Sequence, residues 1–228
     1  MRFLQYLIEG VYDPSIFKAI FLAGGPGSGK SFVATKSTSG LGFKLVNSDI
    51  LFTKMAKDAN IDIGNMKLDG PDAMIRNAVR DRAKSLTAKQ MDRYVKGRLG
   101  LIIDGTGRDY SKIENQRTQL KNIGYDTYMI FVNTSLEVAL ERNEKRERTV
   151  DPKFVKQAWS DVQNNMGKFQ TLFGSNYFRI VDNSVYKSDK NLFADVWKEV
   201  MKFAKKPVES KIAKAWIDAA LQKKKERK

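Results

Sequence analysis

The sequence contains no cysteine and no histidine among its 228 residues. Without cysteine, the chain can form neither a disulfide framework nor a thiolate nucleophile, so an intracellular location is the default expectation. Without histidine, a general base has to be a carboxylate or a lysine, and zinc held by histidine is excluded. The sequence also lacks an apolar run long enough to span a bilayer, and its first residues, which include Glu9, do not form a typical signal peptide.

The composition is that of a folded and strongly basic protein. Hydrophobic residues make up 42% of the chain and aromatic residues 11%, which argues against global disorder. Lysine and arginine total 41 against 26 acidic residues, a formal net charge of +15. Ten basic and three acidic residues follow from Met201 onward, so almost half of the excess lies in the last 28 positions. This segment is interpreted either as a solubilising tail or as a contact for polyanions.

The segment from Gly24 to Ser31 contains the motif G-x-x-x-x-G-K-S. It follows the apolar residues 19–23 and precedes residues 32–36, which can begin a helix, and this is the strand–loop–helix context of a phosphate-binding loop. A glycine-rich surface turn is the alternative interpretation. The motif predicts binding of ATP, with GTP as an alternative, and of Mg²⁺ through Ser31. The predicted nucleotide-binding residues are Gly24, Gly25, Pro26, Gly27, Ser28, Gly29, Lys30, Ser31 and Phe32.

Apolar strands alternate with helices along the chain, which predicts a mainly parallel sheet with right-handed crossovers. The expected strands are residues 18–23, 43–46, 99–104, 125–132 and 177–181. The alternation thus predicts an α/β fold of three layers with five strands and helical appendages at both ends, and its similarity to nucleotide kinases among the P-loop NTPases is an expectation from family resemblance. We expect an amphipathic segment at 1–15, with a helix over 1–9, a kinase domain at 16–206 and a basic helical tail at 207–228.

Two carboxylates follow predicted strands, where ligands bind in open α/β sheets. Asp104 ends the third strand, so a Walker-B role in holding Mg²⁺ is predicted, with a turn aspartate in Asp104-Gly105 as the alternative. Asp49 follows the second strand and could accept a proton from an attacking hydroxyl. Its alternative role is structural, as a helix cap or a first-turn acid, because Ser48 or Asp49 is expected to cap the helix that follows.

Basic residues recur at helical spacing in two places. Arg142 and Arg146 are four apart on one face of a helix expected over 136–148, and Arg148 follows them. They could stabilise the charge of a moving phosphoryl group, or they could belong to an ion-paired surface helix with the neighbouring glutamates. The second row is Arg76, Arg80 and Lys84, on a helix expected over 72–96.

Five segments in this order resemble the zeta-toxin and polynucleotide-kinase group of P-loop kinases, over residues 18–183. They are the phosphate loop, Val46-Asn47-Ser48-Asp49, Ile103-Asp104-Gly105-Thr106, Arg142-x-x-x-Arg146-x-Arg148 and Phe154-x-x-x-x-Trp159-x-x-Val162. The resemblance implies that Asp49 is the base for the acceptor hydroxyl and that Gly105 and Thr106 line the acceptor site. It also implies that Arg142, Arg146 and Arg148 supply the charges of a lid.

Our first hypothesis is a kinase that phosphorylates a hydroxyl of a nucleic acid or nucleotide, either like a polynucleotide kinase or on a hydroxymethyl base of DNA. The net charge supports it, as do Arg76 and Arg80 as contacts for the acceptor. The second hypothesis is a zeta-toxin-like nucleotide-sugar kinase. The third is an accessory or packaged phage protein that binds nucleotide and nucleic acid without catalysis, because Leu7-Ile8-Glu9 resembles the sites cut by phage head-maturation proteases. The expected location is the cytoplasm, that of the host for a phage protein, with packaging in the virion as the alternative.

Overall fold

Five parallel strands form one sheet in the order β2-β3-β1-β4-β5, which confirms the predicted parallel five-stranded sheet. The computed structural model describes residues 11–38, 40–61, 71–146, 149–184 and 190–226, so the helix expected over 1–9 lies outside the described residues. The strands are β1 (Lys18–Ala23), β2 (Lys44–Val46), β3 (Leu101–Asp104), β4 (Asp126–Asn133) and β5 (Phe178–Asp182).

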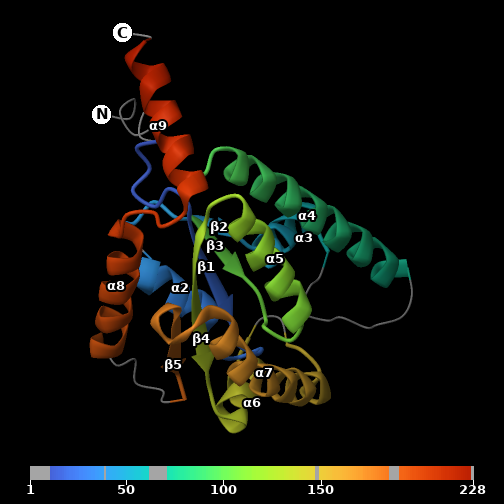
Figure 1. The fold of residues 1–228 in the computed structure, drawn as a ribbon. Coiled ribbons are helices and arrows are strands. Elements are labelled where there is room, and N and C mark those ends of the chain that lie inside the picture. Colours follow the sequence, from blue (N-terminus) through green and yellow to red (C-terminus); the bar gives the residue numbers. More distant parts are fainter. Residues whose placement is uncertain (1–10, 39, 62–70, 147–148, 185–189, 227–228) are drawn as a thin grey trace.

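Helices cover both faces of the sheet and complete the expected three layers (Figure 1). One face carries α2 (Lys30–Thr38) and α8 (Lys190–Lys205). The other face carries α4 (Pro71–Lys96), α5 (Tyr110–Asn122) and α7 (Pro152–Phe173). Two shorter helices, α3 (Ser48–Asp58) and α6 (Leu136–Glu144), follow β2 and β4, and α9 (Lys211–Lys225) ends the described chain.

The central strand β1 is buried along its whole length, because helices pack on both of its faces. Its side chains alternate between the two layers. Phe21 packs with the α5 and α7 layer, whereas Ile20 and Leu22 pack with α2 and α8. This burial fixes the strand's register and so fixes the position of the loop that leaves its carboxyl end.

The basic C-terminal helix α9 packs against the core through its first turns, and its end extends away from the sheet (Figure 1). Ala213 is fully buried where it meets Gly124, and the ring of Trp216 lies 5.5 Å from that of Phe17. The division of the chain at residues 15 and 206 remains a prediction. No helix within the described ranges is long and apolar enough to cross a membrane.

Helix α6 ends at Glu144, so the prediction of a helix as far as residue 148 was wrong. The cause lies in the side chain of Asn143, whose Nδ2 donates to the carbonyl of Val150 over 2.7 Å. Its Oδ1 in turn accepts a hydrogen bond from the Val150 amide over 3.1 Å. Residues 145 and 146 lie outside the helix, so Arg146 does not share a helix face with Arg142.

Candidate active site

The loop between β1 and α2 is shaped by glycine and closed by packing against α6. Gly27 has φ +78°, a conformation that L side chains rarely adopt, and a Cβ on it would collide with the carbonyl oxygen of Ala139. The Ser28 amide donates to the Gly25 carbonyl over 3.2 Å, which forms a tight turn. The Ser28 hydroxyl is buried and has no hydrogen-bond partner in the described structure. The loop thus holds a buried hydroxyl without a partner, beside a position where the neighbouring helix leaves no room for a side chain.

Lys30 lies across this loop. Its Nζ donates to the carbonyls of Gly24 over 2.6 Å and of Gly25 over 3.3 Å. Burial lowers the pKa of Lys30, and the nearby Asp104 carboxylate partly opposes that shift. A partly buried ammonium group, glycine amides and the orphan Ser28 hydroxyl fit a triphosphate, which can pair with all three.

The predicted Mg²⁺ ligands, Ser31 and Asp104, both carry side-chain oxygen atoms and both follow or end central strands of the sheet. Ser31 is in the first turn of α2, and Asp104 ends β3, the strand beside β1. Across the described ranges, no group of three or more acidic side chains converges to hold a metal. Mg²⁺ commonly uses one or two protein oxygens together with water and substrate phosphates, so two oxygen ligands such as Ser31 and Asp104 are compatible with a Mg²⁺ site, and their role in it remains a prediction.

Asp104 is tied to the start of α3 by Asn47. Asn47 Nδ2 donates to Asp104 Oδ2 over 2.5 Å, while Asn47 Oδ1 accepts from the amide of Asp49 over 2.7 Å. Asn47 is therefore the N-cap of α3, and the prediction that Ser48 or Asp49 caps it was wrong. Burial raises the pKa of Asp104, and the Lys30 charge and the Asn47 hydrogen bond counteract that rise.

Asp49 lies close enough to the loop to affect the pKa of both Lys30 and Asp104. Its side chain is 65% exposed, and its Oδ1 is 3.7 Å from Nη2 of Arg80. The Arg80 guanidinium also lies over the ring of Phe52, 5.6 Å from its centroid. The predicted substrate residue Arg80 is thus beside the predicted base, whereas Arg76 is buried.

Two of the three predicted lid arginines approach the phosphate loop. Arg142 Nη1 donates to the Gly27 carbonyl over 3.4 Å, and the charge of Arg146 contributes to lowering the pKa of Lys30. Arg148 lies outside the described residues. Asn183, which the sequence analysis missed, donates from Nδ2 to the Ser28 carbonyl over 2.7 Å. It follows β5, so the rule that sites lie at strand ends could have found it.

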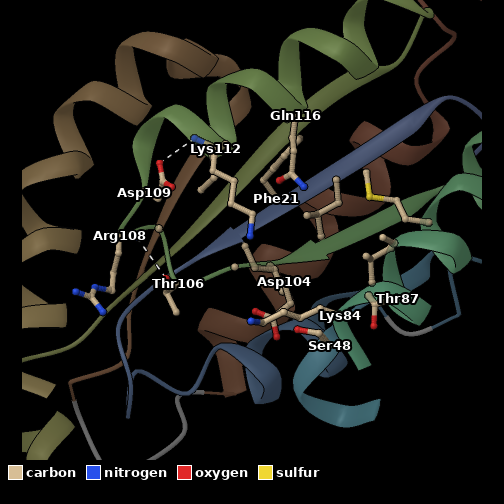
Figure 2. A pocket seen from close by; sticks show the side chains of 18 of the residues that line it. Phe21, Ser48, Lys84, Thr87, Asp104, Thr106, Arg108, Asp109, Lys112 and Gln116 are labelled. Atoms are coloured by element: carbon tan, nitrogen blue, oxygen red, sulfur yellow. Dashed lines mark hydrogen bonds between the residues drawn. The ribbon is translucent and has the colours of Figure 1, made fainter. Parts of the chain in front are cut away.

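A cavity of about 720 Å³ opens at the same edge of the sheet, beside Asp104 (Figure 2). Figure 2 shows Lys112 and Gln116 pointing into it from α5, with Thr87 on α4 opposite them. Gly105 and Thr106, both predicted to line an acceptor site, line this cavity, whereas Asp49, Arg76 and Arg80 lie outside its lining, and Ser48, the neighbour of Asp49, is part of it. The sequence analysis missed Lys112 and Arg108, which also line it.

The phosphate loop, the sheet order and the neighbouring cavity define a P-loop protein with a kinase-type fold. The chain belongs to the AAA domain family, whose sequence profile matches residues 20–168, more than half of the chain. No curated protein matches it.

Solved structures at low sequence identity share this fold. A protein of Chloroflexus aurantiacus, provisionally described as a kinase, superimposes with a TM-score of 0.52 at 15% identity and covers 78% of this chain and 94% of its own. A chain of the PezAT toxin–antitoxin system of Streptococcus pneumoniae has a TM-score of 0.52 at 18% identity, over 91% of this chain and 86% of that one. A chain of AvrRxo1-ORF1:-ORF2 with ATP has a TM-score of 0.54 at 18% identity, over 73% of this chain and 55% of that one.

Proposed function

We propose that this protein is an ATP-dependent phosphotransferase that uses a hydroxyl of a nucleic acid or nucleotide as acceptor. One observation carries the proposal: a cavity of about 720 Å³ is lined by Asp104, whose carboxylate lies close enough to Lys30 of the phosphate loop to affect its pKa. Its volume lies within the usual range of small-molecule sites. Hydrolysis of ATP needs only water as the acceptor. A cavity next to the nucleotide site therefore supports transfer of the phosphoryl group to a bound acceptor molecule.

Each residue then has a role in the transfer. The loop amides and Lys30 hold the triphosphate, and Ser31 and Asp104 hold Mg²⁺, which supplies charge neutralisation when bound. The acceptor oxygen forms a bond to the γ-phosphorus while the bond from that phosphorus to the bridging oxygen breaks, and ADP leaves. The proton of the hydroxyl passes to the Asp49 carboxylate. Arg142 and Arg146 stabilise the charge on the transferred group.

The lining of the cavity supports a nucleoside as the acceptor. Phe21, Val46 and Ile103 provide an apolar floor on which a base or sugar ring can pack. Thr106, Gln116 and Lys112 add hydrogen-bonding groups around that floor. The net charge of +15 favours an acceptor that carries phosphates.

A transfer assay with labelled ATP and Mg²⁺ tests this function. The acceptors are oligonucleotides with a 5′-hydroxyl, hydroxymethylated DNA, nucleoside monophosphates and a nucleotide sugar. We expect label on a nucleic acid or nucleotide, and Asp49→Asn should lower kcat by about 100-fold or more while the affinity for ATP is retained. Asp58→Asn, an exposed change at the other end of α3, is the matched control.

Two other results of the same assay would contradict the proposal. Label that appears only on the nucleotide sugar would assign the protein to the zeta-toxin-like activity instead. If no acceptor is labelled although ATP binds, the chain is a nucleotide-binding protein without this transferase activity.

A further inference from the structure

An exposed aromatic ring stands beside the rim of the acceptor cavity. Phe154, in the first turns of α7, is 45% exposed. The guanidinium carbon of Arg108 lies 4.7 Å from the centroid of its ring, and Arg108 itself lines the cavity. The cavity wall therefore continues outward through Arg108 to a ring that solvent reaches.

Arg108 is held in place at both its side chain and its backbone. Its Nε and Nη2 donate to Asp161 Oδ2 over 3.0 Å and 2.8 Å. The other carboxylate oxygen of Asp161 accepts a hydrogen bond from Gln157 over 2.7 Å. The buried side chain of Asn165 donates to the carbonyls of Gly107 and Arg108 over 3.0 Å and 2.8 Å. The guanidinium plane is thus ordered before any ligand arrives, which lowers the entropic cost of binding.

The charges on the cavity wall do not by themselves explain an aromatic ring at this place. Three basic side chains in the lining, Lys84, Arg108 and Lys112, face three carboxylates, those of Asp104, Asp109 and Asp161. Arg108 and Asp161 neutralise each other, so the rim attracts a ligand less by net charge than by its planar surfaces. An aromatic ring next to a planar guanidinium suits the flat face of a nucleobase, whatever its sequence.

We propose that Phe154, supported by Arg108, is a stacking subsite for the base that neighbours the reacting nucleotide of a single-stranded acceptor. This inference rests on the proposed function, because it takes the cavity as the acceptor site. The reacting nucleotide occupies the cavity, and the strand leaves it over the ring of Phe154. The substrate class is therefore a single-stranded oligonucleotide rather than a mononucleotide.

Fluorescence binding with the intact protein tests this subsite. The probe is a 5′-hydroxyl hexadeoxynucleotide with 2-aminopurine as its second base, titrated in Mg²⁺ and ADP so that no transfer occurs. Stacking on Phe154 should quench the probe. Phe154→Ala should abolish the quenching and weaken binding about 10-fold, whereas Phe154→Trp should retain both. The affinity for a 2-aminopurine mononucleotide should differ less than twofold between Phe154→Ala and the wild type.

The control is Tyr12→Ala, because Tyr12 is another exposed ring beneath a cation, Lys224, and lies outside the lining of the cavity. It should bind the hexanucleotide as the wild type does. If Phe154→Ala melts at a lower temperature than the wild type, Arg108→Lys provides a second test. This change keeps the charge and removes the planar group, so it should also weaken binding of the hexanucleotide.

The outcomes separate this inference from the function on which it rests. Unchanged hexanucleotide binding in Phe154→Ala, equal weakening for the mononucleotide, or no binding of the hexanucleotide to the wild type would each overturn the subsite. An enzyme that phosphorylates nucleotides with any of these results would keep the proposed function and lose the subsite. Quenching that depends on Phe154, without transfer to any acceptor, would support a base-stacking site at Phe154 and contradict the proposed function.

Discussion

At the scale of single residues, the site depends on a balance around Asp104. Burial raises the pKa of this carboxyl, while the charge of Lys30 and the hydrogen bond from Asn47 hold it down. Metal binding needs the ionised form, because a protonated carboxyl is a poor ligand for Mg²⁺. Asn47 therefore does more than cap α3: its amide favours the ionised form of Asp104, which the predicted metal-binding role of this residue would need.

Asn47→Asp tests this balance. Aspartate keeps the capping oxygen, but it replaces the donor to Asp104 with a second carboxylate, which raises the pKa of Asp104 further. The acid limb of the Mg²⁺-dependent activity should therefore move to higher pH than in the wild type. The check is a pH profile of turnover at saturating ATP, with Asp151→Asn at the cap of α7 as the control. An acid limb that stays in place or moves to lower pH would contradict the account.

At the scale of elements, the phosphate loop depends on helix α6 as a fixed support. Gly27 lies against the backbone of Ala139 on α6, and Arg142 of the same helix donates to the Gly27 carbonyl. On the other side, Asn183 fastens the loop to the end of β5. The loop shape is therefore imposed by its neighbours as well as by its own glycines.

Gly27→Ala should destroy this contact, and Gly174→Ala is its matched control. Both glycines have φ +78°, and Gly174 has ψ +151°, so alanine costs about 1–3 kcal/mol of folding free energy at either position through the backbone alone. Only Gly27 has a neighbouring backbone where the new methyl group would lie, while Gly174 has open space around it. We expect both variants to melt earlier and only Gly27→Ala to lose ATP affinity, measured by thermal unfolding and nucleotide titration. Equal ATP affinity in the two variants would show that contact with α6 does not shape the loop.

At the scale of the whole molecule, the sequence predicts what local patterns control. The five strands and the phosphate loop follow from apolar runs and glycine spacing, and the structure has all of them. The predicted end of α6 was wrong because the Asn143 side chain forms a hydrogen bond with the carbonyl of Val150, and the spacing of apolar residues carries no signal for such a contact. The Arg108–Phe154 stack was missed for the related reason that it joins segments far apart in sequence.

In the candidate site, too, local motifs predicted some features, whereas others depend on how distant segments pack. The motif spacing singled out Lys30, Asp49 and Asp104 in advance, and the structure brings Asp49 close enough to the other two for its charge to affect the pKa values of Lys30 and Asp104. The pairing of Asp49 with Arg80 depends on how α3 packs against α4, and the cavity lining depends on how α4, α5 and the strands converge. Their catalytic roles remain predictions.

The central claim is that the loop around Lys30 binds a nucleoside triphosphate, and calorimetric titration with Mg²⁺-ATP tests it most directly. We expect saturable heat with one site per chain in the wild type and at least about 10-fold weaker binding in Lys30→Ala, because the variant loses a charged donor to the phosphates. The absence of heat in a folded wild type, or equal affinity in the two proteins, would contradict the account.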